Sequence, residues 1–83
     1  CHELLMIKVA ARPEQRQGIV SIADIFRAKV VDAGKESLII ELTGNQSKLG
    51  AFLNLLDGYE ILELARTGIT GLSRGSDNVT IIE

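Results

Sequence analysis

The chain has 83 residues, 46% of them hydrophobic, and its nine basic and eleven acidic side chains give a formal net charge of −2. This length suits one small domain with a modest core, and the apolar content argues against a disordered chain. The charges are scattered, which argues against a nucleic-acid-binding protein, and no apolar run approaches the ~18 residues of a membrane span. One cysteine permits no internal disulfide and suits a reducing compartment, so we expect a cytoplasmic protein.

The first predicted strand runs from His2 to Ala11, where side chains alternate with a period of two. Leu5, Ile7 and Val9 share the more aliphatic face, which we assign to the core.

A helix is predicted next, because Pro13 suits a first helical turn. Its apolar stripe has the i, i+3, i+4, i+7 spacing of a helix packed on a sheet: Ile19, Ile22, Ala23 and Phe26. Gly18 lies inside this segment and costs a helix ~1 kcal/mol relative to Ala, so we expect the helix to start late.

A β-hairpin follows, with strands at Lys29–Asp32 and Ser37–Thr43. The polar link between them, Ala33-Gly34-Lys35-Glu36, contains the glycine that a tight turn favours. The residues of its second strand that we expect in the core are Leu38, Ile40 and Leu42.

A second helix is predicted after the hairpin, capped either by Thr43, in a capping box with Gln46, or by Asn45. Its apolar stripe repeats the spacing of the first: Leu49, Phe52, Leu53 and Leu56. Gly58 is expected at the C′ position that ends this helix.

The fourth predicted strand spans Tyr59–Thr67, with Leu62 and Leu64 facing the core. The residues expected on its other face are Ile61, Glu63, Ala65 and Thr67. We expect an extended tail after this strand, with an added edge strand as one option for Val79–Ile82 and disorder near Ser76–Asn78.

The predicted order, strand–helix–strand twice, is that of the split βαβ arrangement. We therefore predict an α+β fold: a ferredoxin-like (ACT-like) βαββαβ sandwich with a four-stranded antiparallel sheet and two helices on one face. Residues 1–83 should form a single domain with its core in 3–68 and a C-terminal tail in 69–83. Because the chain begins with Cys1 instead of Met, we interpret it as a fragment of a longer polypeptide.

Packing both helices on one face leaves the opposite sheet face open. Half-apolar faces of this kind often serve as contact surfaces, and the alternative is an ordinary amphipathic sheet. The residues expected on this face are Met6, Ile39, Ile61, Ala65, Lys8, Glu41 and Glu63.

Few residues offer catalytic or metal-binding chemistry. Cys1, His2 and Glu3 lie at a chain end without a second cluster, and His2 is the only histidine, so we predict no metal site and no catalytic residue. Two arginine–glycine segments, Arg66-Thr67-Gly68 and Ser73-Arg74-Gly75, could bind a carboxylate or phosphate. The alternative for these segments is a strand end followed by turns with solvated arginines.

Three stretches together resemble one family: HELLMIKV at His2–Val9, IFRAKVVDAGKESLIIELTGNQSKLGAFLNLL at Ile25–Leu56, and YEILELARTGITGLSRG at Tyr59–Gly75. Over nearly its whole length, the chain resembles the C-terminal domain of the small, regulatory subunit of acetolactate synthase, also called acetohydroxyacid synthase. It departs from the family at Gly50, where Asp is common before Ala-Phe, and Gly50 lowers local helix propensity.

This resemblance implies a non-catalytic module for dimerisation and for activating and regulating a separate catalytic subunit in branched-chain amino acid biosynthesis. It implies that thiamine diphosphate, Mg²⁺ and FAD belong to the large catalytic subunit, and that no cofactor binds this chain. It places valine feedback inhibition in an N-terminal ACT domain that these residues do not include. The expected partners are the catalytic subunit and a second copy, without nucleic acid or membrane, in the cytoplasm or in a eukaryotic plastid or mitochondrion.

No motif of the family assigns single contact residues, so we predict them from expected exposure. They are Arg66, Thr67, Arg74, Met6, Ile39, Glu41, Ile61 and Glu63. The alternative function is an independent ACT-like dimer that binds an amino acid between paired domains.

Overall fold

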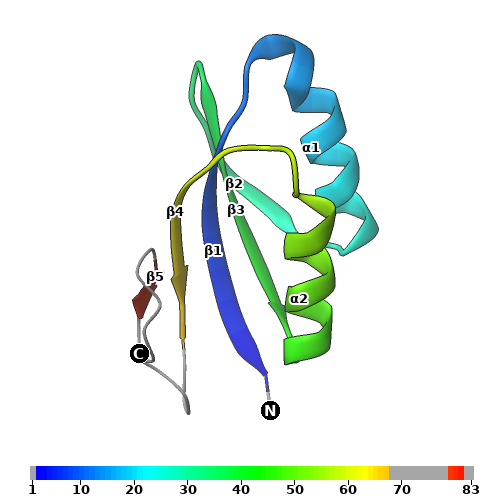
Figure 1. Cartoon of the computed structure of the whole chain (residues 1–83), viewed down its shortest axis with the longest axis vertical. Helices are drawn as coiled ribbons and strands as arrows, with labels where there is room; N and C mark the ends of the chain where they lie inside the picture. The colour runs from blue at the N-terminus through cyan, green and yellow to red at the C-terminus, as the bar shows by residue number, and fades with distance from the viewer. Residues whose placement is uncertain (1, 68–78, 82–83) are drawn as a thin grey trace.

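The computed structural model describes residues 2–67 and 79–81 of the chain. Within them, two α-helices and five β-strands follow one another (Figure 1). In chain order they are β1 (Glu3–Ala10), α1 (Pro13–Ile25), β2 (Lys29–Ala33), β3 (Ser37–Gly44), α2 (Gln46–Leu55), β4 (Ile61–Arg66) and β5 (Val79–Ile81). The predicted alternation of strands and helices is confirmed.

The strands form one sheet in the order β2-β3-β1-β4-β5. β1 pairs antiparallel with β3 and β4, and β2 pairs antiparallel with β3, whereas β5 pairs parallel with β4. Both helices lie on one side of this sheet (Figure 1). The predicted ferredoxin-like fold is therefore confirmed, and β5 supplies the additional edge strand considered for the tail. The segment predicted to be disordered, Ser76–Asn78, lies outside the described residues.

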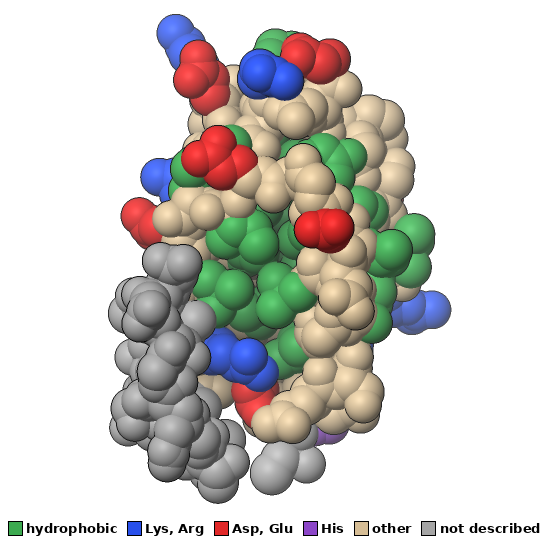
Figure 2. All heavy atoms as spheres, in the orientation of Figure 1, with side chains coloured by type: hydrophobic (Ala, Val, Ile, Leu, Met, Phe, Trp, Pro, Cys, Tyr) green, Lys and Arg blue, Asp and Glu red, His purple; other side chains and the backbone are tan. Residues whose placement is uncertain are grey.

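The hydrophobic core lies between the sheet and the helices. Its buried residues are Leu5, Ile7, Val9, Ala11, Ile19, Ala23, Leu38, Ile40, Leu42, Leu49, Phe52 and Leu56. Figure 2 shows hydrophobic side chains filling the space between the sheet and α2. Phe26 and Phe52 join the two helices edge to face, with ring centroids 5.4 Å apart. The inward positions predicted for β1, β3 and both helices are confirmed, with Ile22, Phe26 and Leu53 only partly buried against this core.

Helix α1 begins at Pro13, so the late start predicted from Gly18 is wrong. A Cβ atom at Gly18 would lie 2.5 Å from the hydroxyl oxygen of Tyr59. The missing side chain therefore makes room for the tyrosine, which packs against the core from the link before β4. Helix propensity alone gives the wrong prediction at Gly18, because the contact with Tyr59, which is distant in sequence, determines which residue fits there.

The ends of α2 are set by Asn45 and Gly58. The Asn45 side-chain oxygen accepts a hydrogen bond from the backbone N–H of Lys48 at 2.8 Å, so Asn45 is the cap and Thr43 is not. Gly58 has a φ of +100°, which favours glycine. Gly58 was predicted at C′, but the C-cap is Leu56, so C′ is Asp57 and Gly58 follows it at C″.

A β-bulge interrupts the alternation predicted for β4. Leu64 lies opposite Ile7 and packs against the core as predicted. The register then shifts, so that Ile61 lies opposite Val9 and Leu62 is an extra residue. Leu62 is 45% exposed, and its predicted core position is wrong. The predicted place of Ile61 on the open face is also wrong, because one inserted residue exchanges the two faces of a strand.

Candidate protein interaction surface

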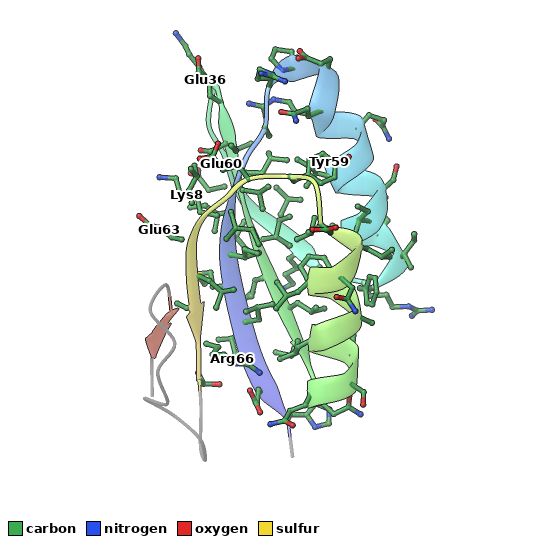
Figure 3. The ribbon with its side chains drawn as sticks, viewed as in Figure 1. Lys8, Glu36, Tyr59, Glu60, Glu63 and Arg66 are labelled. Atoms are coloured by element: carbon green, nitrogen blue, oxygen red, sulfur yellow. The ribbon has the colours of Figure 1, made fainter. Side chains whose placement is uncertain are left out.

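The sheet face turned away from the helices carries two rows of side chains that cross four strands. From β2 to β4, the register places Asp32, Ile39, Lys8 and Glu63 in the first row. In the same strand order, it places Lys29, Glu41, Met6 and Ala65 in the second row. Opposite residues of antiparallel strands point to the same side, so these eight residues form what we name the open face. Figure 3 shows Lys8 and Glu63 projecting from the sheet on the side away from the helices.

The open face combines an apolar centre with charges of both signs. Ile39 and Met6 lie on the two middle strands and are partly buried by their neighbours. Around them stand two lysines and three carboxylates. Within the described part of the chain, none of these charged side chains forms an ion pair, although Lys8 lies opposite Glu63 on the adjacent strand. Alternating charges around apolar residues are a pattern that a facing protein surface can complement.

Two residues of the open face, Lys29 and Asp32, were not predicted. Both belong to β2, which forms one edge of the sheet and has all five residues exposed. A register shift leaves Val31 as an extra residue between them, so the short sequence KVVDA shows no plain alternation. Lys29 could have been predicted from the sequence, because it pairs with the oppositely charged Glu41 on β3.

Arg66 lies on the helix side of the sheet, opposite Leu5, and is engaged within the domain. Its Nη2 and Nε donate hydrogen bonds to Oε1 of Glu3 at 2.7 and 3.1 Å. Figure 3 shows Arg66 extending from β4 across the start of β1. The hydrogen bond from Arg66 holds the pKa of the Glu3 carboxyl below its ordinary value, and a weaker hydrogen bond from Gln46 acts in the same direction. Arg66 was predicted as part of a site for an external carboxylate or phosphate, but its guanidinium binds the carboxylate of Glu3 within the domain.

Thr67 is engaged at the same end of the sheet, where its Oγ1 accepts a hydrogen bond from the backbone N–H of Leu4 at 2.9 Å. Arg74 and its neighbours Ser73 and Gly75 lie outside the described residues, as does Gly68. Of the residues predicted as partner contacts, the structure brings four together on the open face: Met6, Ile39, Glu41 and Glu63. Ile61, Arg66 and Thr67 do not join them.

A cavity of about 340 Å³ lies at the opposite end of β1 from Glu3, between the β1–α1 link, the β2–β3 turn and the link before β4. Arg12, Glu36 and Glu60 contribute charged side chains to its wall. Arg12 already pairs with Glu14 at 2.9 Å, and both of these side chains are largely exposed. No polar side chain is buried in the described part of the chain, so the cavity offers no desolvated group that would select a ligand.

Residues 2–67 and 79–81 do not favour metal binding or membrane insertion. They contain no group of three or more His, Cys, Asp or Glu side chains that could hold a metal ion. Neither of the helices they form is long and apolar enough to cross a membrane. The open face is therefore the strongest candidate functional surface that the structure describes.

Comparison with known proteins agrees with the fold. Residues 2–75 match the family model of the small subunit of acetolactate synthase. A probable acetolactate synthase small subunit from Archaeoglobus fulgidus is 49% identical over 74 residues, which are 89% of this chain and 46% of that protein. The small subunit from Bacillus subtilis is 43% identical over 74 residues, 89% of this chain and 43% of the relative.

A solved structure gives the same result. The crystal structure of the acetolactate synthase small subunit from Thermotoga maritima superimposes with a TM-score of 0.74 and 45% sequence identity, over 81% of this chain and 41% of that one. The chain thus spans less than half the length of the relatives and the solved structure that it matches. Because the family model covers most of the chain, the chain belongs to the family of acetolactate synthase small subunits.

Proposed function

We propose that this domain is a non-catalytic, C-terminal regulatory module that binds and activates the catalytic subunit of acetolactate synthase. The observation that carries the proposal is the family match over residues 2–75, at identities above 40%. Family membership at this level supports the same role in branched-chain amino acid biosynthesis. We further infer that thiamine diphosphate, Mg²⁺ and FAD bind the catalytic subunit, and that the module works in the cytoplasm or, in a eukaryote, an organelle.

The chemistry of the described residues supports a binding role. Strongly shifted pKa values of titratable groups in a cleft often mark a catalytic site. The pKa of the Glu3 carboxyl is lowered chiefly by the hydrogen bond from Arg66, so a structural pair within the domain accounts for the shift. The open face instead offers a mixed apolar and charged surface of the kind that contacts a protein.

Regulation requires that the module bind two states of its partner with different affinities. We propose that the effector is valine. Its site would lie in the part of the related small subunits that this chain does not match. On this proposal, the present domain transmits the effect by holding subunits together, which makes its protein contacts the functional feature.

An activity titration tests the proposal. The purified catalytic subunit of acetolactate synthase receives increasing amounts of the chain, while turnover and complex formation are both measured. We expect saturable binding and a rise in turnover. A catalytic subunit that responds to its complete small subunit but shows neither binding nor activation with this chain would contradict the proposal.

The alternative, an independent dimer that binds an amino acid, predicts a different result. Calorimetric titration of the chain alone with valine, leucine or isoleucine should then give saturable heat. We favour the regulatory module, because the charged wall of the 340 Å³ cavity is formed by exposed side chains without a buried polar group.

A further inference from the structure

We infer that a groove between β4 and α2 binds an amphipathic helix of the catalytic subunit, with the apolar side of that helix buried and a basic side chain at one end. The inference rests on the proposed function for the identity of the partner, and it names the site on this chain and the element that fills it. The groove lies on the helix side of the sheet, so it is separate from the open face.

The helix side of β4 remains partly exposed and forms one wall of the groove. Ile61 lies opposite Val9, and so points toward the side on which the helices lie. Leu64 lies opposite Ile7 and points the same way. Helix α2 packs chiefly over β3, whereas β4 packs chiefly against the strands β1 and β5. Ile61 is therefore 40% exposed, although Val9 beside it is fully buried. The β-bulge at Leu62 turns Ile61 to this side, and bulges often re-aim a side chain for function.

The flank of α2 that faces β4 forms the other wall. Gln46, Gly50 and Leu53 recur at the i, i+4, i+7 spacing of one helix face. Gln46 donates a hydrogen bond to Glu3, which binds Arg66 of β4, so this flank is turned toward β4. Leu53 is only partly buried against the core, and a Cβ atom at Gly50 would meet no atom within 4 Å. The wall is therefore low, and a partner can approach α2 closely.

The two walls enclose what we name the β4–α2 groove, which is lined by Ile61, Leu64, Gly50 and Leu53. Figure 2 shows hydrophobic side chains open to view between the sheet and α2. Figure 3 shows Glu60 and Arg66 at opposite ends of β4, which mark the two ends of the groove. From Ile61 to Arg66, at about 3.3 Å per residue, the groove is about 16 Å long, or about three turns of an α-helix.

The position of the groove over a face of the sheet determines the structure of its occupant. A sheet face presents side chains, whereas its backbone N–H and C=O groups pair with the neighbouring strands. An extended segment lying in the groove would therefore leave its own backbone groups unpaired, which is costly once water is excluded. A helix pairs these groups internally and can bury an apolar stripe, as α2 does on the same sheet. The groove thus fits a helix better than a strand.

The charges at the two ends of the groove differ. At one end, the guanidinium of Arg66 already binds the carboxylate of Glu3. At the other end, Asp57 and Glu60 lie exposed in the link between α2 and β4, and neither forms an ion pair within the described part of the chain. Carboxylates at the rim of an apolar surface are complemented by a basic side chain of the partner. The partner helix therefore carries its Lys or Arg at the end beside Asp57 and Glu60.

Calorimetric titration of the chain with the purified catalytic subunit is the first test. Ile61→Glu places a charge in the groove, and we expect it to weaken binding at least tenfold, because the charge would be buried without a partner. Val31→Glu is the matched control, since Val31 is 46% exposed and lies on β2, at the other edge of the sheet. The control should bind as the parent chain does, and circular dichroism checks that both variants fold.

A pair of charge reversals tests the acidic end and leaves the apolar walls unchanged. The variant D57K/E60K should weaken binding at least fivefold at low salt, and this effect should shrink as salt screens the charges. The variant D24K/E36K changes the net charge by the same amount at two exposed positions away from the groove. It should bind as the parent chain does.

Cross-linking identifies the occupant directly. Ile61→Cys, combined with Cys1→Ser, leaves one cysteine to carry a benzophenone, and mass spectrometry locates the segment of the catalytic subunit that it captures. We expect a segment with apolar residues at i, i+3, i+4 and i+7 and a Lys or Arg at one end of this stripe. Capture of a segment without this spacing would overturn the inference.

The outcomes separate this inference from the proposed function. Weaker binding of Ile61→Glu and of D57K/E60K, with both controls unchanged, would support the inference. If the catalytic subunit binds the chain and is activated, but these two variants bind as the parent does, the inference is wrong and the function stands. Loss of binding in Ile39→Lys alone would assign the contact to the open face, with the same consequence. A catalytic subunit that responds to its complete small subunit but never binds this chain would refute the function, and the inference with it.

Discussion

The two faces of the sheet are built from alternate residues of the same strands, yet they have different chemistry. On the helix side, the core residues of β1 and β3 are aliphatic and at most 2% exposed: Leu5, Ile7, Val9, Leu38, Ile40 and Leu42. On the open face, their immediate neighbours are partly exposed, and lysines and carboxylates stand among the apolar side chains. A shift of one residue would exchange the two sets, so the buried face fixes the register for both. The open face is thereby held in place without contributing much to stability, and its residues are free to serve recognition.

The largest expected effect separates two adjacent isoleucines of β3. Ile40 is fully buried, whereas Ile39 lies on the open face. Ile40→Ala should lower the free energy of unfolding by about 2–5 kcal/mol, because it removes buried methyl groups and leaves a cavity. Ile39→Ala, the matched control, should cost less than about 1 kcal/mol. Urea-induced unfolding of both variants measures the difference.

Equal costs at these two positions would contradict the distinction between the faces. The loss of unfolding free energy caused by Ile39→Ala could also grow with protein concentration. Association stabilises the folded state by mass action, so such a dependence would show that the open face is covered in an assembly.

Strands β3 and β4 show how far the sequence could predict this fold. In β3, strict alternation places Leu38, Ile40 and Leu42 in the core, and all three are buried. The sequence of β4 alternates as well, but the bulge changes its faces at Ile61 and Leu62. Periodicity within one strand reports which residues share a face. It cannot report a residue inserted relative to the neighbouring strand, since that depends on the pairing.

The same limit of local alternation explains which residues of the open face were predicted and which were missed. Met6, Ile39, Glu41 and Glu63 follow from alternation in three strands, and the structure places them together. Lys29 and Asp32 were missed because a bulge lies between them in a strand of five residues. The pairing of Arg66 with Glu3 joins residues 63 positions apart in the chain, and no local pattern predicts such a contact.

A smaller effect tests how tightly the helix side is packed at its rim. Gly18→Ala would add a methyl group 2.5 Å from the Tyr59 hydroxyl oxygen. We expect it to destabilise the domain by about 1 kcal/mol, although alanine favours a helix by a similar amount. Tyr59→Phe removes the hydroxyl, so the same Gly18→Ala change should become neutral or stabilising in that background. Thermal unfolding of the four proteins measures this coupling, and additive effects would show that the contact does not determine the residue at position 18.

The smallest effect concerns the polar end of the helix side, where Glu3 and Arg66 meet. The pKa of the Glu3 carboxyl is lowered in the folded chain, chiefly by the hydrogen bond from Arg66. Between the folded and the ordinary pKa the unfolded chain binds more protons, so unfolding becomes easier as the pH falls through this range. The contribution of the pair is thus complete at neutral pH and lost in acid. Glu3→Gln should cost up to about 1 kcal/mol at pH 7 and almost nothing once the pH has fallen below the lowered pKa of Glu3 in the folded chain.

Glu14→Gln is the matched control for this change, because Glu14 also pairs with an arginine, Arg12, at 2.9 Å. The Glu14 and Arg12 side chains are 67% and 71% exposed, against 11% and 28% for Glu3 and Arg66. The control should change the free energy of unfolding by less than about 0.5 kcal/mol, because solvent screens an exposed pair. Unfolding by urea at a series of pH values compares the two variants. If both lost the same stability at pH 7, the position of the Glu3–Arg66 pair on the helix side would give it no advantage over a pair at the surface.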